Sequence, residues 1–279
     1  MRIFPLILLI IVLLTVVLLY DSNTRLVTTE YTLHYRNLPA GFDGYRIAVI
    51  SDLHAAQFGS DNERLIAMVA AAQPDIIAIT GDLIDGHKKP PQEEQLQIAE
   101  TLTAGLVEIA PVYYITGNHD WNSGGLRELT PILEKLGVNI LRNRFLELKS
   151  GGDSLILAGT DDRNGPAEMI KPDELVERIR AAFGDSFIVM LEHRNNNLQL
   201  YSELGVDLII SGHAHGGMIR LPFTDGLVGP QRDLFPTYTS GIYPMGDTNM
   251  LVSRGLGNHT GLPRFMNNPQ VVVAVLRQT

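Results

Sequence analysis

Short apolar blocks alternate with amphipathic ones along most of this 279-residue chain, and each block predicts one strand or one helix. Largely apolar runs, typical of strands buried on both faces, occupy residues 46–51, 75–80, 112–116, 153–160, 186–193 and 207–211. Segments with apolar residues at helical spacing lie at 60–73, 90–109, 123–137, 171–184 and 194–205. This alternation predicts an α/β domain with helices covering both faces of a sheet.

The two ends of the predicted domain carry further β-rich sequence. A polar tether and a β-rich stretch occupy residues 21–39, before the first apolar run. Near the carboxyl terminus, residues 249–257 and 269–277 predict two strands that close a second sheet. Residues 86–91, with two prolines and two lysines, predict a surface loop within the domain.

The first residues of the chain differ from everything that follows. Residues 3–20 carry no charge, and at about 1.5 Å per residue they extend roughly 27 Å, close to the thickness of a bilayer's hydrocarbon core. A buried core helix is the weaker alternative, because the segment has no polar face. No small-x-small cleavage site follows it, which argues against a signal peptide. We therefore predict an uncleaved membrane anchor over residues 1–22 and one domain over residues 23–279.

Charges beside the anchor bear on its orientation. Arg2 precedes the span and Asp21 follows it, which favours an amino terminus inside the cell and a domain outside the cytoplasm. Arg25 on the far side makes this bias small. The expected location is thus the cell membrane, with a single span and an extracytoplasmic domain.

Composition excludes some functions. The formal net charge of -9 argues against a nucleic-acid partner, because binding to the phosphate backbone requires clusters of Lys and Arg. The absence of cysteine excludes disulfides and thiolate metal ligands. The oligomeric state cannot be inferred from the sequence.

Polar residues of a particular kind follow five of the predicted strands. Ligands of open α/β sheets bind at the carboxyl ends of strands, so residues placed there are candidates for a site. Five of the eight histidines occupy such positions. The residues at these ends are Asp52 and His54, Asp82, Asn118 and His119, His193, and His213 and His215.

The residue types and spacing at these ends suit a metal site. In extended chain, residues i and i+2 point the same way, so Asp52 can converge with His54, and His213 with His215. Carboxylate, imidazole and amide donors without thiolate suit divalent Mn, Fe or Zn. Taken singly, each motif is more often a turn, a helix cap or a hydrogen-bonded histidine than a ligand set. Their combination at successive strand ends favours the metal site.

The motifs "DLH", "GDLID", "GNHD", "LEH" and "GHAHGG", in this order, resemble those of the calcineurin-like metallophosphoesterase superfamily. The stretches "YRIAVISDLH", "PDIIAITGDLID" and "SGHAHGGMIRLP" look like its membrane-associated phosphodiesterase branch. The likeness runs from about Tyr31 to Arg277. It implies a four-layer sandwich of two mixed β-sheets flanked by helices, preceded here by the predicted transmembrane helix.

The resemblance also implies roles for the polar residues. One divalent ion would be held by Asp52, His54, Asp82 and His215, and a second by Asp82, Asn118, His193 and His213. A hydroxide bridging the two ions would attack phosphorus. His119 would be the catalytic histidine and Asp85 would orient it. The chain departs from the family at "HRNNN", where a proline often follows the lone histidine, so residues 194–197 put the substrate in question.

These implications leave several functions open. The first is a membrane-anchored phosphodiesterase or pyrophosphatase acting on a lipid-linked or cell-envelope phosphate ester. A phosphomonoesterase of the same fold is the alternative among enzymes. A non-catalytic scaffold would be expected to have lost ligands, and this chain keeps them.

Outside the motifs, Asp161 and Asp162 follow another strand, and a loop containing His259 and Arg264 is expected over the site.

Overall fold

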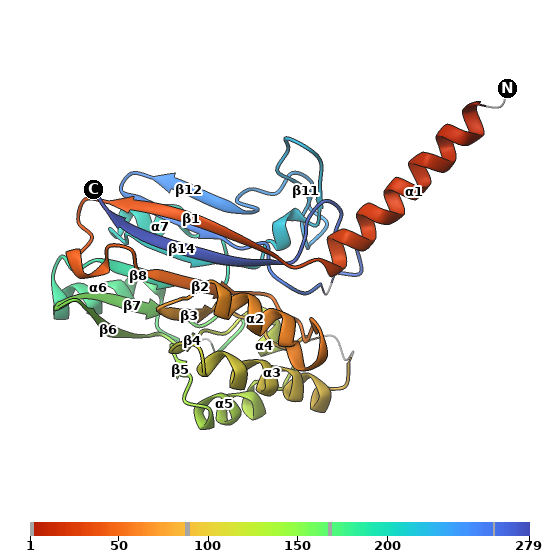
Figure 1. The fold of residues 1–279 in the computed structure, drawn as a ribbon. Coiled ribbons are helices and arrows are strands. Elements are labelled where there is room, and N and C mark those ends of the chain that lie inside the picture. Colours follow the sequence, from red (N-terminus) through yellow and green to blue (C-terminus); the bar gives the residue numbers. More distant parts are fainter. Residues whose placement is uncertain (1–2, 87–89, 167–168, 259) are drawn as a thin grey trace.

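Two six-stranded mixed sheets pack face to face, with helices on the outer face of each, in the computed structural model shown in Figure 1. The structure describes residues 3–86, 90–166, 169–258 and 260–279, so His87 and His259 lie outside the described residues. The four layers implied by the family resemblance are confirmed. The expectation of helices on both faces of one sheet is wrong, because each sheet carries helices on one face and the other sheet on its second face. A strand apolar on both faces packs equally well against either neighbour, so its sequence does not distinguish them.

The first sheet holds the amino-terminal half of the domain. Its strand order is β1 (Val27–Tyr35), β14 (Gln270–Gln278), β2 (Arg46–Ile50), β3 (Ile76–Ile79), β4 (Val112–Tyr114) and β5 (Asn139–Ile140). Strands β2 to β5 are parallel, whereas β14 runs antiparallel to β2 and parallel to β1. The prediction that residues 269–277 close the second sheet is therefore wrong. They form a central strand of the first sheet, buried from residue 270 to residue 276, and pair over nine residues with β1.

The second sheet holds most of the remaining strands. Its order is β12 (Gly241–Met245), β13 (Thr248–Val252), β9 (Leu208–Ser211), β8 (Ile188–Leu191), β7 (Asp153–Gly159) and β6 (Arg144–Ser150). The inner four strands are parallel and the two edge strands are antiparallel. Neither β6 nor β12 was predicted, because edge strands are only partly buried and lack the continuous apolar run of the central strands. Residues 249–252 of the predicted strand 249–257 do lie in this sheet.

Helices complete the outer layers. The helices α2 (Glu63–Ala71), α3 (Gln92–Val107) and α5 (Leu126–Lys135) bury their apolar sides on the first sheet. The helices α6 (Pro172–Phe183) and α7 (Leu198–Glu203) do so on the second. A short helix, α4 (Asn118–Asn122), begins directly within the "GNHD" motif, and a 3-10 turn spans His215–Gly217.

The apolar helix α1 (Ile3–Thr24) stands away from the domain (Figure 1). Its residues 4–24 are apolar and long enough to cross a membrane, and none of the most apolar stretch is buried against the domain. The helix continues past the predicted boundary at residue 22. Its last turn docks on the domain, where the side chain of Asn23 exchanges hydrogen bonds with the backbone of Arg264 (2.9 and 3.1 Å).

Candidate metal centre

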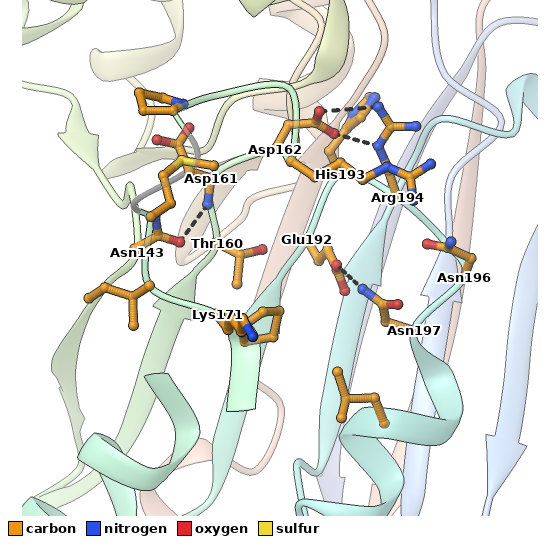
Figure 2. Close-up of a pocket in the computed structure, with 16 residues that line it drawn as sticks. Asn143, Thr160, Asp161, Asp162, Lys171, Glu192, His193, Arg194, Asn196 and Asn197 are labelled. Atoms are coloured by element: carbon orange, nitrogen blue, oxygen red, sulfur yellow. Dashed lines mark hydrogen bonds and ion pairs between the residues drawn. The ribbon is translucent and has the colours of Figure 1, made fainter. Parts of the chain in front are cut away.

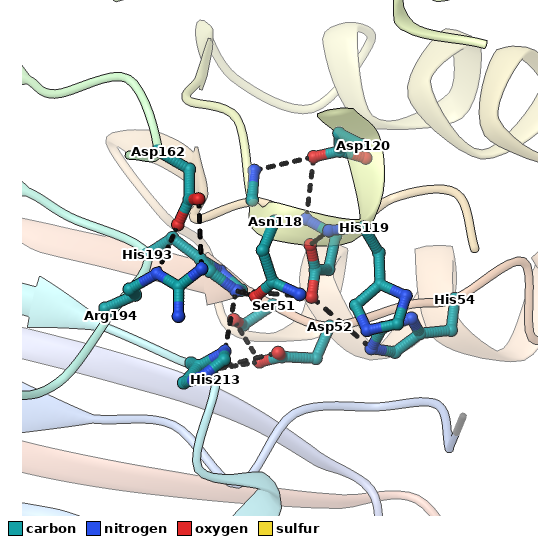
Figure 3. A network of polar contacts seen from close by, with 12 residues as sticks. Ser51, Asp52, His54, Asn118, His119, Asp120, Asp162, His193, Arg194 and His213 are labelled. Atoms are coloured by element: carbon teal, nitrogen blue, oxygen red, sulfur yellow. Dashed lines mark hydrogen bonds and ion pairs between the residues drawn. The ribbon is translucent and has the colours of Figure 1, made fainter. Parts of the chain in front are cut away.

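The polar strand ends of both sheets meet at one end of the sandwich. Loops after β2, β3 and β4 come from the first sheet, and loops after β8 and β9 come from the second. The expectation of a single sheet edge is therefore replaced by two edges that face each other. Figure 3 shows the side chains from these loops pointing toward one another. All nine residues named from the sequence lie in this cluster or in contact with it: Asp52, His54, Asp82, Asp85, Asn118, His119, His193, His213 and His215.

One group of donors joins the loop after β2 to the loop after β9. The imidazole Nε2 atoms of His54 and His215 lie 3.3 Å apart, and their rings stack. The Oδ1 atom of Asp52 lies 3.6 Å from His215 Nε2. One ligand atom from each of these three buried residues falls within 4.8 Å of the others, a spacing that suits a single metal ion.

A second group surrounds the loop after β3. The Oδ2 atom of Asp82 lies 3.2 Å from His193 Nε2, which in turn lies 3.1 Å from Asn118 Oδ1 and 3.2 Å from His213 Nδ1. Asp82 Oδ2 also faces His54 Nε2 of the first group at 3.6 Å. Asp82 therefore lies between the two groups.

The orientation of His193 shows that the second group favours a cation. Its Nδ1 lies 2.8 Å from the carbonyl oxygen of Thr80, which can only accept, so Nδ1 carries a proton and donates it. In the neutral ring, Nε2 then offers a lone pair toward the oxygens of Asp82 and Asn118. Asp82 Oδ2 is buried and lies 3.2 Å from this Nε2. Acceptors that face one another in this way fit a shared divalent ion.

The electrostatics of the cluster agree with this reading. Burial disfavours a charged His193, yet the carboxylates of Asp82, Asp52 and Asp162 outweigh burial and raise the pKa of His193 to about 10. Burial likewise opposes ionisation of Asp82, but His193, His54 and His119 hold the pKa of its carboxyl well below the usual range. A buried pocket that would hold a proton this firmly is one that stabilises positive charge.

His119 lies at the mouth of the cluster with Asp85 behind it. Its Nδ1 is 3.0 Å from Asp85 Oδ1, and its ring packs edge-on against His54 at 4.7 Å between ring centroids. Burial lowers the pKa of His119, but the contact with Asp85 and the charge of Asp82 raise it overall. The contact with Asp85 therefore fixes the ring of His119 beside the cluster. His119 also falls in a third possible ligand group, with His54 and Asp82.

Backbone strain is concentrated at the cluster. Five of its residues have φ between 46° and 66°, a region that side-chain-bearing residues seldom adopt: Asp52, His54, Asp82, His213 and His215. Such conformations cost about 1–3 kcal/mol each and persist where the surrounding structure imposes them. The backbone is also closely packed here, because a Cβ on Gly212 would meet Ser51 Oγ at 1.8 Å and Asp52 Oδ2 at 2.4 Å. The glycine of "GHAH" thus allows the two sheets to touch at the site.

Asp120 is a functional residue that the sequence reasoning missed. This fully buried carboxylate accepts hydrogen bonds from the backbone N–H groups of Gly117 (2.8 Å), Asp82 (2.8 Å) and Ile84 (3.2 Å). Burial raises its pKa to about 7. It ties the loop after β3 to the start of α4, and so fixes Asp82 relative to His119. The signal was its place in "GNHD", a motif in which roles were assigned only to Asn118 and His119.

The departure at "HRNNN" forms one wall of the site. Arg194 Nε and Nη2 donate to both carboxylate oxygens of Asp162 (2.7 and 3.1 Å), as Figure 2 shows. A cavity of about 410 Å³ opens beside this pair and reaches His193. Its wall includes Glu192, whose pKa burial raises to about 7, and Asn197, whose amide donates to Glu192 at 2.5 Å.

Two other sequence expectations are settled by contacts. Arg264 is buried, and its guanidinium donates to the carbonyl of Gly257 at 2.7 Å and lies 3.4 Å from His215 Nδ1. It therefore lies in contact with His215, and not in a loop over the site. Asp161 contacts Arg142 and Trp121 and takes part in the wall.

The motifs and their geometry agree with comparison to known proteins. Residues 45–217, more than half of the chain, match the family model described as calcineurin-like phosphoesterase. The chain belongs to the calcineurin-like phosphoesterase family. Members of this family are metal-dependent phosphoester hydrolases, and the buried His and Asp groups described above could hold metal ions.

Relatives of this phosphoesterase extend the likeness over most of the chain. It is 32% identical over 257 residues to an uncharacterized metallophosphoesterase of Bacillus subtilis, YkuE, covering 90% of this chain and 86% of the relative. It is 26% identical over 236 residues to the Escherichia coli phosphodiesterase YaeI, covering 83% of this chain and 82% of that one. A zebrafish transmembrane protein with a metallophosphoesterase domain is 26% identical over 86% of this chain and 55% of its own length.

A solved structure shares the fold. The NAD nucleotidase of Haemophilus influenzae superposes with a TM-score of 0.50 at 14% sequence identity, covering 76% of this chain and 45% of that one. At this identity the likeness concerns the fold alone.

Proposed function

We propose that this phosphoesterase is a membrane-anchored, two-metal hydrolase of phosphodiester or pyrophosphate bonds. The observation that carries the proposal is the pair of ligand groups that meet at Asp82. Two adjacent ions of this kind stabilise both the attacking and the leaving oxygen of a phosphoryl transfer. A single structural ion would need only one of the two groups.

The first ion would be held by Asp52, His54, Asp82 and His215, and the second by Asp82, Asn118, His193 and His213. The spacing of Asp52, His54 and His215, and of Asp82, His193 and His213, supports this division. Asn118 supports it as well, because its Oδ1 faces His193 Nε2. Nitrogen and oxygen donors without sulfur favour Mn, Fe or Zn.

Bound metals would supply an activated water and neutralise the charge of the phosphate oxygens. The protein supplies the rest of the chemistry. We assign His119 as general acid, because its ring packs against His54 of the first ligand group while Asp85 contacts its Nδ1. Asp85 acts as a positioning residue that keeps the ring turned toward the leaving oxygen.

The cavity beside the site supports the proposed preference for diesters. The cavity next to His193 offers room for the organic group beyond the phosphate, and Asn143, Glu192 and Asn197 line it with hydrogen-bonding atoms. A phosphomonoester carries one organic group, its leaving alcohol, whereas a diester carries a second one that this cavity could hold. A phosphomonoesterase remains the second candidate, since nothing in the ligand groups excludes a monoester.

The anchor completes the proposal. The helix α1 is fixed to the domain by Asn23 and lies close to Arg264, which contacts the ligand His215. Such an arrangement would hold the metal centre near the bilayer surface. We therefore propose a lipid-linked or cell-envelope phosphate ester as substrate and, from the charge bias beside the span, an extracytoplasmic domain.

The test is a metal analysis of the purified full-length protein, followed by assays on a panel of soluble diesters, pyrophosphates and monoesters with and without added Mn²⁺. We expect two metal equivalents and faster turnover of diesters or pyrophosphates than of monoesters. Preference for monoesters would favour the second candidate. No hydrolysis of any phosphate ester by a fully metallated sample would instead support a non-catalytic scaffold.

A further inference from the structure

Outside α1, large apolar side chains with high exposure gather in one small region of the described structure. Of the five such residues, only Phe183 lies elsewhere. The other four are Leu221 (46% exposed), Phe223 (108%), Leu234 (70%) and Phe235 (73%). They lie on two loops that flank β11 (Gly226–Val228), residues 221–225 and residues 229–237, which we call the apolar loops.

The apolar loops extend from a hairpin that is joined to the base of α1. Strand β10 (Ile219–Arg220) pairs with β11, and Arg220 N donates to the carbonyl of Phe265 at 3.0 Å. The neighbouring residue, Arg264, is the one that exchanges hydrogen bonds with Asn23 of α1. Figure 1 shows the β11 region and the base of α1 on the same side of the domain.

The same loops border the metal centre. The 3-10 turn His215–Gly217 leads directly into β10, and a cavity of about 240 Å³ is shared by His213, Arg194 and the second apolar loop. That loop contributes Pro230, Gln231, Asp233 and Pro236 to the cavity. A ligand held by the apolar loops would therefore lie next to the second ligand group.

The backbone that carries the exposed aromatic rings is strained. Phe223 and Phe235 have φ of 66° and 54°, a region in which a bulky residue is a conformational outlier. Strained residues of this kind are associated with functional segments. Here the strain holds two phenyl rings in solvent, where they bury little of their surface.

We propose that the apolar loops insert into the surface of a phospholipid bilayer beside α1, so that the metal centre opens at the lipid interface. Exposed aromatic and aliphatic side chains next to a membrane span are more stable in a bilayer surface than in water. The contact between Arg264 and Asn23 joins the apolar loops to the anchor, which favours the bilayer over a separate protein as their binding partner. The inference rests on the proposed role of α1 as a membrane anchor. It deepens the proposed function, because it would give the site access to phosphate esters embedded in the bilayer.

The chain has no cysteine, so single cysteines can be labelled one at a time in the full-length protein. We would introduce Phe223→Cys, Phe235→Cys, Leu13→Cys and Phe183→Cys, attach a nitroxide, and reconstitute each variant in phosphatidylcholine and phosphatidylglycerol vesicles. Leu13 lies within α1 and reports on the anchor. Phe183 is the matched control, an exposed phenylalanine at the end of α6. Relaxation by oxygen and by a water-soluble nickel complex then measures the depth of each label.

We expect the ratio of oxygen to nickel accessibility at residues 223 and 235 to exceed that at residue 183 several-fold and to approach that at residue 13. Equal ratios at 223, 235 and 183 would overturn the inference while leaving the anchor intact if residue 13 remains in lipid. Low accessibility to both reagents at 223 and 235 would also overturn it, since it would indicate burial against protein, either within this chain or in a second copy. A label at residue 13 exposed to nickel would refute the anchor itself. None of these results depends on phosphoesterase activity, so failure of the proposed catalysis stays distinguishable.

Discussion

The two sheets contribute different chemistry to the metal centre. The loops of the first sheet provide all three carboxylates (Asp52, Asp82 and Asp85), together with Asn118 and His119. The loops of the second sheet provide only imidazoles, from His193, His213 and His215. In the proposed centre, the negative charge that would attract metal thus lies on one half of the domain, and the second half would add imidazole donors that suit borderline divalent ions.

The two halves are also fixed in different ways. In the first sheet, Asp120 ties the loop after β3 to the loop after β4, and the backbone N–H of His54 donates to Asp82 O and joins the loop after β2. Those of the second sheet are tied across to the first, because His193 donates to Thr80 O and the backbone N–H of His213 donates to Asp52. The first sheet therefore forms a preorganised half-site, on which the second is placed. This difference predicts that substitutions in the two halves will have unequal effects on metal content, activity and stability.

The largest effect is expected for Asp82→Asn. Because Asp82 faces both ligand groups, its loss should reduce the metal content from two ions per chain to less than one, and activity should fall by about 10³-fold, the several kcal/mol that metal ions contribute. The matched change in the second sheet, His213→Ala, should remove only one ion. Metal analysis by mass spectrometry checks both. Equal metal loss in the two variants would contradict the division of labour between the sheets.

His119→Ala should separate catalysis from metal binding. We expect both ions to remain, with activity on diesters of alkyl alcohols reduced by about 10²–10⁴-fold, the usual contribution of a general acid. Nitrophenyl esters, whose leaving group needs no proton, should lose much less. The measurement is the activity of wild type and His119→Ala on both classes of substrate at saturating metal. A uniform loss on both, or a loss of one ion, would instead place His119 among the ligands.

Asp120→Ala tests the rigidity of the first half-site. The change leaves the backbone N–H groups of Gly117, Asp82 and Ile84 without an acceptor, so the free energy of unfolding should fall by about 1–3 kcal/mol. Urea denaturation of the metal-free protein measures it. Asp185→Ala, at an exposed aspartate of the second half, should stay within about 0.5 kcal/mol of wild type. A neutral Asp120→Ala would show that the loops do not depend on this carboxylate.

The smallest effect concerns Asp207, at the end of β9 away from the site. Its Oδ2 accepts from Ile188 N at 2.7 Å and its Oδ1 from Asn37 at 2.6 Å, yet burial outweighs these bonds and raises the pKa of its carboxyl. A raised pKa means that stability present below the unfolded value, near 3.8, is lost as pH rises through the folded value. Above about pH 4, the free energy of unfolding of wild type should therefore fall relative to that of Asp207→Asn. The loss should be about 1.4 kcal/mol for each pH unit by which the pKa of Asp207 in the folded protein exceeds its unfolded value. Parallel pH profiles of Tm for the two proteins would refute this.

The elements that carry the site could be predicted from sequence because their signals are local. Continuous apolar runs predicted β2, β3, β8 and β9, and the polar residues that follow them converge in space as expected. The family resemblance then implied two sheets packed face to face with helices outside, an arrangement that periodicity cannot show. An apolar strand such as β3 reads the same whether a helix or another sheet covers it.

What could not be predicted depends on contacts between distant residues. The place of β14 is set by pairing with β1, about 240 residues earlier in the chain, and both sheets offer apolar faces to such a strand. The role of Asp120 depends on three backbone N–H groups brought to it by the fold. The exposure of Phe223 and Phe235 could not be predicted from the sequence either, since isolated phenylalanines are more often buried.

The most direct test of the central claim is electron paramagnetic resonance of the metal-free, full-length protein titrated with Mn²⁺. Two ions that share Asp82 must be close enough for their spins to couple. We predict that the spectrum at two equivalents shows an exchange-coupled pair, and that Asp82→Asn loses this signal. An isolated six-line Mn²⁺ spectrum in the wild type at every loading would contradict a two-ion centre built where the two sheets meet.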